Sequence, residues 1–341
     1  MLLLVQHLFI NGIWASYGIE IRTAIAALLV GIVVGITGMG GGALMTPALL
    51  FLGVGHASAI VTADLTAAAV YKTSGAAVHW REGSPNMRLA AFLICGSVPM
   101  ALLGPHLVRW VNPEANIDNF LTVCIGFALL FAATTYALRL YVELKRRAKG
   151  FTRGSRELVV RPVPTMLIGA LGGLLVGITS VGSGSVIMIA LLMLYPTLSA
   201  VKLVGTDLVQ AVPLVLAAAI SNILVHGLDW AIAIPLVVGS VPGCLLGAKI
   251  APLIRGSYIR RGIVVVLTMS GLALLDKAGW LLADGDNGGT HPKLIALVGV
   301  VLLVVIPFVW ALLRRSLGLP MFGPPTIKQI EEPPRKDSQR T

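Results

Sequence analysis

Two glycine-rich stretches lie 142 residues apart and offer backbone and hydroxyl groups suited to bind a small anion. One reads GITGMGGGAL from Gly35, and the other reads GITSVGSGSV from Gly177. Each interrupts apolar sequence just before a second apolar run, ALMTPALL or VIMIALL. Glycines that break a membrane helix let a ligand approach the bare N–H groups of the next half-helix, and these amides and the helix dipole attract anions. The pattern therefore predicts two half-helix ends that face one oxyanion.

Hydroxyl side chains in the same stretches add hydrogen-bond donors that suit an oxyanion. The alternative explanation is close packing, because small residues often let membrane helices approach each other. The density and duplication of the glycines favour a functional break. The candidate substrate-binding residues in the two stretches are Thr37, Gly38, Gly40, Gly41, Gly42, Thr179, Ser180, Gly182, Ser183, Gly184 and Ser185.

Four charged residues lie inside or near the ends of apolar segments: Asp64, Lys72, Lys202 and Asp207. A charge at the centre of a bilayer costs at least about 2.5–3.5 kcal/mol, so it is a functional candidate by default. We expect Lys72 to bind the anion or to pair with an aspartate. Asp64 and Asp207 are expected to balance that charge, to cap a helix or to couple transport to a proton. Lys202 lies near a segment end, where a long side chain reaches the interface.

Other chemistries find little support in the sequence. No His, Cys, Asp or Glu cluster has the spacing of metal ligands, and there is no Walker A sequence, so we expect no metal, cofactor or catalytic residue. An intramembrane serine hydrolase, with a serine of GSGS as nucleophile and His226 as base, stays an unfavoured alternative. The first stretch has no serine at the corresponding positions. The three cysteines are expected to be buried thiols.

The composition is that of a membrane protein. Hydrophobic residues make up 56% of the 341 residues and charged residues 12%, whereas soluble domains carry about 25% charged residues. The mean hydropathy is +0.89, and several windows approach the roughly 20 apolar residues that a membrane helix needs. The net charge of +11 comes from basic residues clustered between apolar segments, which is typical of cytoplasmic loops rather than of nucleic-acid binding. The expected partners are therefore the lipid bilayer and a small anionic substrate, with no nucleic acid, and the oligomeric state stays open.

The apolar segments have lengths that suit helices, so the expected fold is an all-α polytopic membrane protein. The segments lie at about 19–36, 43–54, 56–79, 87–108, 117–142, 163–179, 185–195, 199–225, 230–252, 259–282 and 293–313.

The chain contains an internal repeat of about 140 residues. Asp64 in VTADL matches Asp207 in VGTDL, and GSVP recurs at 96–99 and 239–242, each pair 143 residues apart. We expect each repeat to contain a glycine-broken helical hairpin and three crossings, and the two repeats to have opposite orientations, as in many transporters. One extra C-terminal helix follows the second repeat.

Loop charges predict the layout and the orientation. The loop 143–162 holds seven basic and two acidic residues, so we expect it in the cytoplasm. The expected parts are an apolar N-terminal segment (1–18), repeat 1 (19–142), the basic loop, repeat 2 (163–282), an outer loop with the last helix (283–313) and a cytoplasmic tail (314–341).

Taken in order, the motifs resemble the sulfite exporter TauE/SafE family. They are GITGMGGGALMTP, VTADL, HWREG and GSVPMALLG in the first half, and GITSVGSGS, VGTDL, HGLDW and GSVPGCLLG in the second. The resemblance covers about residues 24–275. It implies a permease of the bacterial inner membrane for small sulfur-containing anions such as sulfite or organosulfonates. Serines replace glycines in the second stretch, so a permease or channel for another solute, such as a carboxylate, stays an alternative.

Overall fold

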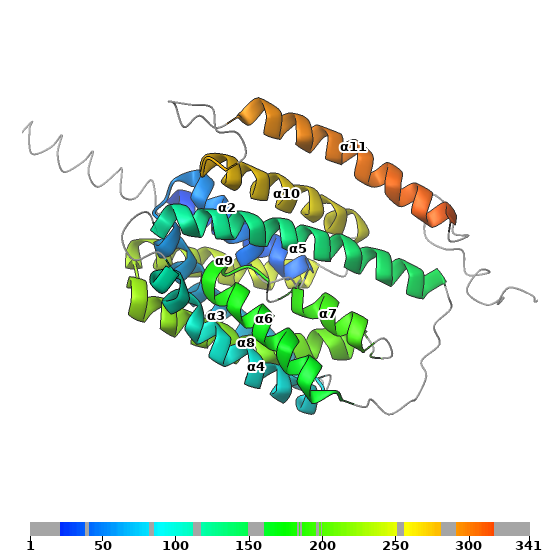
Figure 1. The fold of residues 1–341 in the computed structure, drawn as a ribbon, viewed down its shortest axis with the longest axis horizontal. Helices are drawn as coiled ribbons and strands as arrows, with labels where there is room; N and C mark the ends of the chain where they lie inside the picture. Colours follow the sequence, from blue (N-terminus) through cyan, green and yellow to red (C-terminus); the bar gives the residue numbers. More distant parts are fainter. Residues whose placement is uncertain are drawn as a thin grey trace, which may run out of the picture.

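The computed structural model describes residues 21–37, 41–81, 85–111, 117–148, 160–182, 184, 186–195, 198, 200–250, 256–280 and 291–316. These residues form an all-helical bundle (Figure 1). Segment 1–18 and the tail beyond 316 lie outside the described residues. The helices are Ile21–Thr37, α2 (Gly42–Leu52), α3 (Ala57–Arg81), α4 (Met87–Val111), α5 (Ile117–Ala148), α6 (Pro162–Thr179), α7 (Val186–Leu194), α8 (Ala200–His226), α9 (Trp230–Ile250), α10 (Gly256–Lys277) and α11 (Pro292–Ser316).

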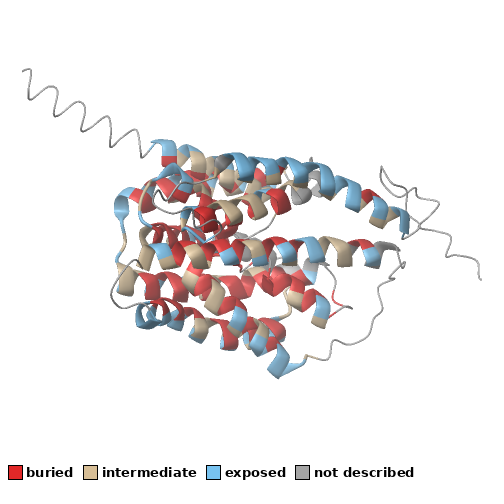
Figure 2. Ribbon diagram, turned by 45° about the horizontal axis from the view of Figure 1, so that its top comes forward, coloured by how far each residue is buried: buried red, intermediate tan, exposed pale blue. Residues whose placement is uncertain are grey.

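Six helices of the described part are long and apolar enough to cross a membrane. They are α4, α6, α9, α11 and the apolar parts of α5 and α8. Buried residues gather inside the bundle, and exposed residues line its outer helices (Figure 2). The chain is therefore a multi-pass membrane protein. Helices α3 and α10 have 25 and 22 residues but carry internal charges, and that they also cross stays a prediction.

Two short helices follow the glycine-rich stretches, as the sequence predicts. Helix α2 has 11 residues and α7 has 9, so each is at most about 16 Å long, half the thickness of a bilayer core. The preceding helices end at Thr37 and Thr179. Ser180 adopts a left-handed backbone with φ 59°, and its N–H donates to the carbonyl oxygen of Val176 at 2.9 Å. This turn closes α6 and stops the helix before α7.

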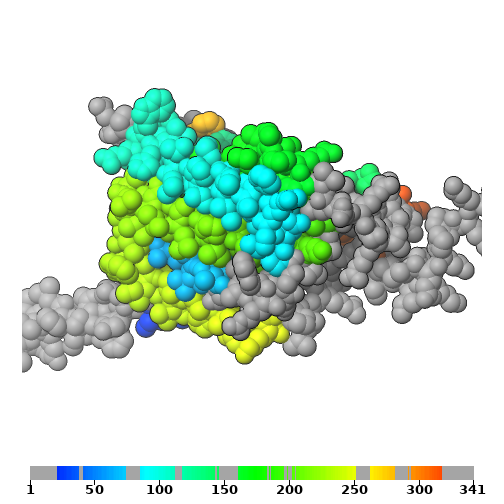
Figure 3. All heavy atoms as spheres, turned by 90° about the horizontal axis from the view of Figure 1, so that it is seen from below, coloured from blue at the N-terminus to red at the C-terminus, as the bar shows by residue number. Residues whose placement is uncertain are grey.

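The two halves of the chain pack on each other through glycines. On α6, a methyl group at Gly173 would collide with the carbonyl oxygen of Ser97 on α4. On α9, a methyl group at Gly243 would collide with the carbonyl oxygen of Leu28, in the helix before α2. The first helix of each half therefore packs closely against the fourth helix of the other half, which needs small residues. Figure 3 shows a face on which α4 (cyan) lies beside yellow-green residues of the second half.

One sequence expectation about side-chain burial is wrong. Cys95 is exposed, while Cys124 and Cys244 are half-buried. Cys95 lies on the outer side of α4, where an apolar thiol can face lipid as readily as protein.

Candidate functional site

Three buried charges of the described helices gather between α3 and α8, which pack side by side, while a fourth, Asp276, lies on α10 beside His291. Asp64 and Lys72 lie on α3 and are 0% and 6% exposed, and Asp207 on α8 is 3% exposed. Lys72 interacts electrostatically with both aspartates. The structure thus brings together three of the predicted residues, two of which are 143 positions apart. Lys202, by contrast, lies exposed near the start of α8.

Asp64 connects the two glycine-rich stretches. Its Oδ2 accepts hydrogen bonds from Thr46 Oγ1 at 2.7 Å and from Ser180 Oγ at 2.8 Å. Thr46 lies on α2 in the first half, and Ser180 ends α6 in the second half. The other oxygen, Oδ1, is buried and has no hydrogen-bond partner among the described residues. Such an unsatisfied buried oxygen is costly, so it requires an explanation.

The two glycine-rich stretches touch where Gly42 meets the backbone of Ser180. A methyl group at Gly42 would collide with the backbone carbonyl of Ser180. The N–H of Gly41 donates to the hydroxyl oxygen of Tyr71 on α3 at 2.9 Å, and a methyl group at Gly41 would collide with the same hydroxyl. Glycine is needed at both positions because backbone and side chains approach there more closely than a Cβ allows.

Two of the predicted hydroxyl donors form hydrogen bonds to carbonyl oxygens of their own helices. Thr37 Oγ1 donates to the carbonyl oxygen of Val33 at 2.7 Å, and Thr179 Oγ1 donates to that of Leu175 at 2.7 Å. Gly182 has φ 118°, a conformation suited to glycine, and Gly184 lies in the turn before α7. The candidates Gly38, Gly40, Ser183 and Ser185 lie outside the described residues.

Asp207 has different polar neighbours from Asp64. Its Oδ1 accepts a hydrogen bond from Gln210 Nε2 at 3.1 Å, and it interacts electrostatically with Arg139 of α5 as well as with Lys72. Asn222, also on α8, donates to the carbonyl oxygen of Gly177 at 2.9 Å. Helix α8 thus contacts the second glycine-rich stretch directly.

Sequence reasoning missed Tyr71 and Thr46 as parts of this cluster. Tyr71 directly precedes Lys72 in an alanine-rich segment, and a tyrosine buried there needs a partner for its hydroxyl. Thr46 follows the glycines of the first stretch by one helical turn, which places it on the same side of the helix as Gly42. Both signals were present in the sequence, but neither identifies the atom that the hydroxyl meets.

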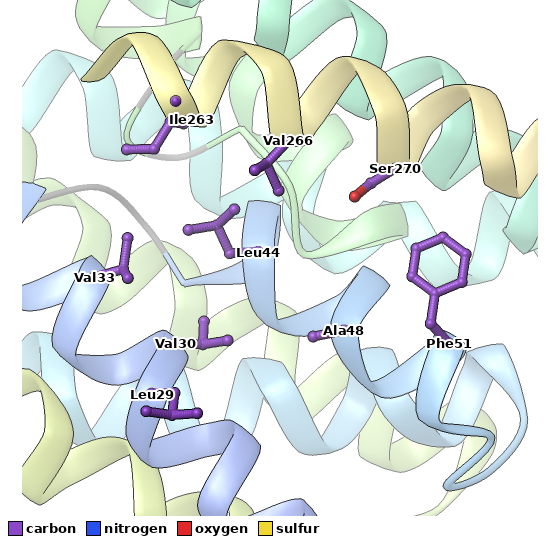
Figure 4. Close-up of a pocket in the computed structure, with 10 residues that line it drawn as sticks. Leu29, Val30, Val33, Leu44, Ala48, Phe51, Ile263, Val266 and Ser270 are labelled. Atoms are coloured by element: carbon purple, nitrogen blue, oxygen red, sulfur yellow. The ribbon is translucent and has the colours of Figure 1, made fainter. Parts of the chain in front are cut away.

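A cavity of about 560 Å³ lies elsewhere, between the Ile21–Thr37 helix, α2 and α10 (Figure 4). Its lining is apolar apart from Ser270, which does not suit a small anion. No group of three His, Cys, Asp or Glu that could hold a metal ion occurs in the described part of the chain. The residues that line this apolar cavity are Leu29, Val30, Val33, Leu44, Ala48, Phe51, Gly262, Ile263, Val266 and Ser270.

The candidate site is therefore the cluster of Asp64, Lys72 and Asp207 with the two helix breaks.

The fold and the buried charges define a multi-pass membrane protein with a polar interior site. Residues 23–274 match the family described as sulfite exporter TauE/SafE. The chain belongs to this family, which consists of membrane transporters and not of enzymes.

Two relatives from Bacillus subtilis (strain 168) support this assignment. The chain is 33% identical over 257 residues to "Probable membrane transporter protein YjnA", which covers 75% of this chain and 100% of the relative. It is 26% identical over 247 residues to "Probable membrane transporter protein YdhB", which covers 72% of this chain and 96% of the relative. No solved structure matches the chain.

Proposed function

We propose that the protein is a secondary transporter of small sulfur-containing anions, such as sulfite or organosulfonates, in the bacterial inner membrane. The observation that carries the proposal is the contact between Gly42 and Ser180, whose hydroxyl binds Asp64, a carboxylate that interacts electrostatically with the buried Lys72. A cation and two helix breaks in one membrane-embedded place form a site that attracts an anion. The description of the family supplies the sulfur oxyanion as the first substrate to test.

In this proposal the anion binds near the midplane, between the half-helix ends. Lys72 supplies the positive charge, and the N–H groups of Gly41, Gly42, Gly182 and Gly184 supply donors. Some donors have internal partners in the described state: Gly41 N–H is bound to Tyr71, and the Ser180 hydroxyl is bound to Asp64. The entering anion replaces such partners, so the protein avoids bare buried donors when the site is empty.

The remaining candidate residues have supporting roles in the proposal. Thr37 and Thr179 end the helices before the breaks, while Gly38, Gly40, Ser183 and Ser185 belong to the breaks themselves. Asp64 and Asp207 interact with Lys72 when no anion is bound, and Arg139 adds a second positive charge near Asp207. Membership of a transporter family removes the intramembrane serine hydrolase from consideration.

The proposal is tested by sulfite flux into proteoliposomes under an imposed pH gradient, with wild type beside Lys72→Ala. Protein-free liposomes correct for leakage of the neutral sulfur dioxide that forms from sulfite in acid. Hydrogen bonds to a charged group contribute about 1.5–3 kcal/mol, so we expect the flux of Lys72→Ala to fall at least about tenfold.

Lys72→Ala leaves two buried aspartates without that lysine, so its folding needs a separate check by size-exclusion chromatography. The double variant Lys72→Ala/Asp64→Asn lowers the remaining negative charge and is expected to fold but not to transport. If folded wild type moves no sulfite, the sulfite proposal is wrong. Organosulfonates and carboxylates then distinguish the remaining sulfur-anion proposal from the carboxylate alternative.

A further inference from the structure

We propose that Asp64, and not its repeat-related partner Asp207, carries a proton that moves together with the anion. This inference rests on the proposed function, because it needs an anion that binds at Lys72. It identifies the proton as the coupling ion and Asp64 Oδ1 as the atom that holds it.

The hydrogen bonds of Asp64 leave one oxygen available for a proton. Thr46 and Ser180 both donate to Oδ2, while Oδ1 is buried without a partner among the described residues. A proton on Oδ1 leaves both bonds to Oδ2 intact. It also removes the negative charge from a side chain that is 0% exposed, where an ionised carboxylate is expensive.

The surrounding charges distinguish Asp64 from Asp207. Lys72 acts on both carboxylates. Asp207 also interacts with Arg139 of α5 and accepts a hydrogen bond from Gln210. Among the described residues, Lys72 is the cation that acts on Asp64, beside the hydroxyls of Thr46 and Ser180. An anion at Lys72 therefore leaves Asp64 without a facing cation, whereas Asp207 keeps Arg139.

The described residues packed around Asp64 bring the following titratable, charged and hydroxyl groups toward it. Its own helix α3 carries Tyr71 and Lys72, which both interact electrostatically with Asp64. Helix α8 carries Asp207, which interacts with Lys72. Helix α9 supplies Cys244, which interacts with Tyr71. Helix α2 and the end of α6 supply the hydroxyls of Thr46 and Ser180. Helix α5 packs on α3 and supplies Arg139, which acts on Asp207.

Anion binding and protonation of Asp64 then favour each other. An anion at Lys72 takes up the positive charge that stabilises ionised Asp64, so Asp64 binds a proton. When the anion leaves, Lys72 again faces the carboxylate and the proton dissociates from Oδ1. Because such linkage is reciprocal, the anion and the proton cross the membrane in the same direction.

The test compares two fluxes in the same proteoliposomes: sulfite exchange at equal pH on both sides, and sulfite uptake driven by an acidic exterior. The measured quantity is the ratio of driven uptake to exchange, corrected with protein-free liposomes. For Asp64→Asn, which cannot release a proton, we expect this ratio to fall at least tenfold. For Asp207→Asn we expect a ratio within about twofold of wild type, whatever its exchange rate.

A second variant keeps the inference testable if Asp64→Asn does not fold. Thr46→Val removes one hydroxyl that stabilises the ionised carboxylate, so driven uptake should reach its half-maximum at a higher pH than in wild type. A ratio in Asp64→Asn equal to that of wild type overturns the inference, as does an unshifted profile in Thr46→Val. If wild type neither exchanges nor takes up sulfite, the proposed sulfite transport is overturned instead. If wild type exchanges sulfite but its uptake does not respond to pH, only the proposed proton coupling is overturned.

Discussion

Tyr71 binds the Gly41 N–H at the first helix break, a group that we propose also binds the anion. Its hydroxyl oxygen accepts the N–H of Gly41 at 2.9 Å, and its side chain is 5% exposed. A break in a membrane helix leaves N–H groups that must be bound by protein, water or ligand. Tyr71 is therefore both a structural partner of the break and a competitor of the proposed anion.

Tyr71→Phe should make the protein less stable without substrate and more responsive to it. The change leaves the Gly41 N–H without its partner, and an unsatisfied buried donor costs about 1–3 kcal/mol. Thermal unfolding in detergent, with and without sulfite, measures both effects. We expect a lower Tm in the absence of sulfite and a larger rise on its addition than in wild type. An equal rise in both proteins would argue against an anion at the Gly41 N–H.

For single residues, the sequence predicted which buried charges lie close together better than which atoms they meet. Asp64, Lys72 and Asp207 are prominent because charged residues are rare in apolar segments, and they lie together in the structure. The hydrogen bond from Ser180 to Asp64 spans 116 positions. No local pattern predicts such a contact, since it depends on how the two halves pack.

At the scale of elements, the helix boundaries follow from the sequence because apolar runs and their polar ends are local features. Helix α6 begins at Pro162, a residue favoured at the first helical position. Helix α5 continues to Ala148, beyond the predicted apolar end at 142. The extension ELKRRA consists of residues with good helix propensity, so the helix continues after the apolar sequence ends.

Two glycines, one at the crossing of α4 and α6 and one on α10 away from that crossing, should respond differently to substitution by alanine. Gly173→Ala would drive a methyl group into the backbone of Ser97, and the crowding should cost about 1–3 kcal/mol. Gly262→Ala, on helix α10, meets no atom of the described residues within 4 Å. It should be neutral or stabilise the protein by up to about 1 kcal/mol, because alanine favours a helix over glycine.

Thermal unfolding of the two variants in the same detergent checks this comparison. We expect Gly173→Ala to unfold at a lower temperature than wild type and Gly262→Ala at the same or a higher temperature. Equal Tm values for both variants would contradict a close crossing of α4 and α6.

At the scale of the whole molecule, the two halves exchange corresponding contacts. Helix α4 packs on α6, and α9 packs on the Ile21–Thr37 helix through glycines at related positions, such as Gly104 and Gly247. This reciprocity supports two related halves. The opposite orientation of the halves stays a prediction from loop charges, as does the cytoplasmic position of the loop 143–162 and of the C-terminus.

Cysteine labelling tests that orientation. In a background without Cys95, Cys124 and Cys244, we expect Asn287→Cys to react with a membrane-impermeant maleimide in intact cells. Ser155→Cys, in the basic loop, should react after permeabilisation and not before. Labelling of Ser155→Cys in intact cells would reverse the predicted orientation, and labelling of both positions from one side would contradict the predicted number of crossings between them.

The proposed transport depends most on an anion bound at Lys72 between the two helix breaks. Equilibrium binding of labelled sulfite to the purified protein measures this directly, with Lys72→Ala beside Lys202→Ala, whose lysine is exposed. We expect saturable binding that weakens at least about tenfold in Lys72→Ala and is unchanged in Lys202→Ala. Sulfite affinity in folded Lys72→Ala equal to that of wild type would contradict it.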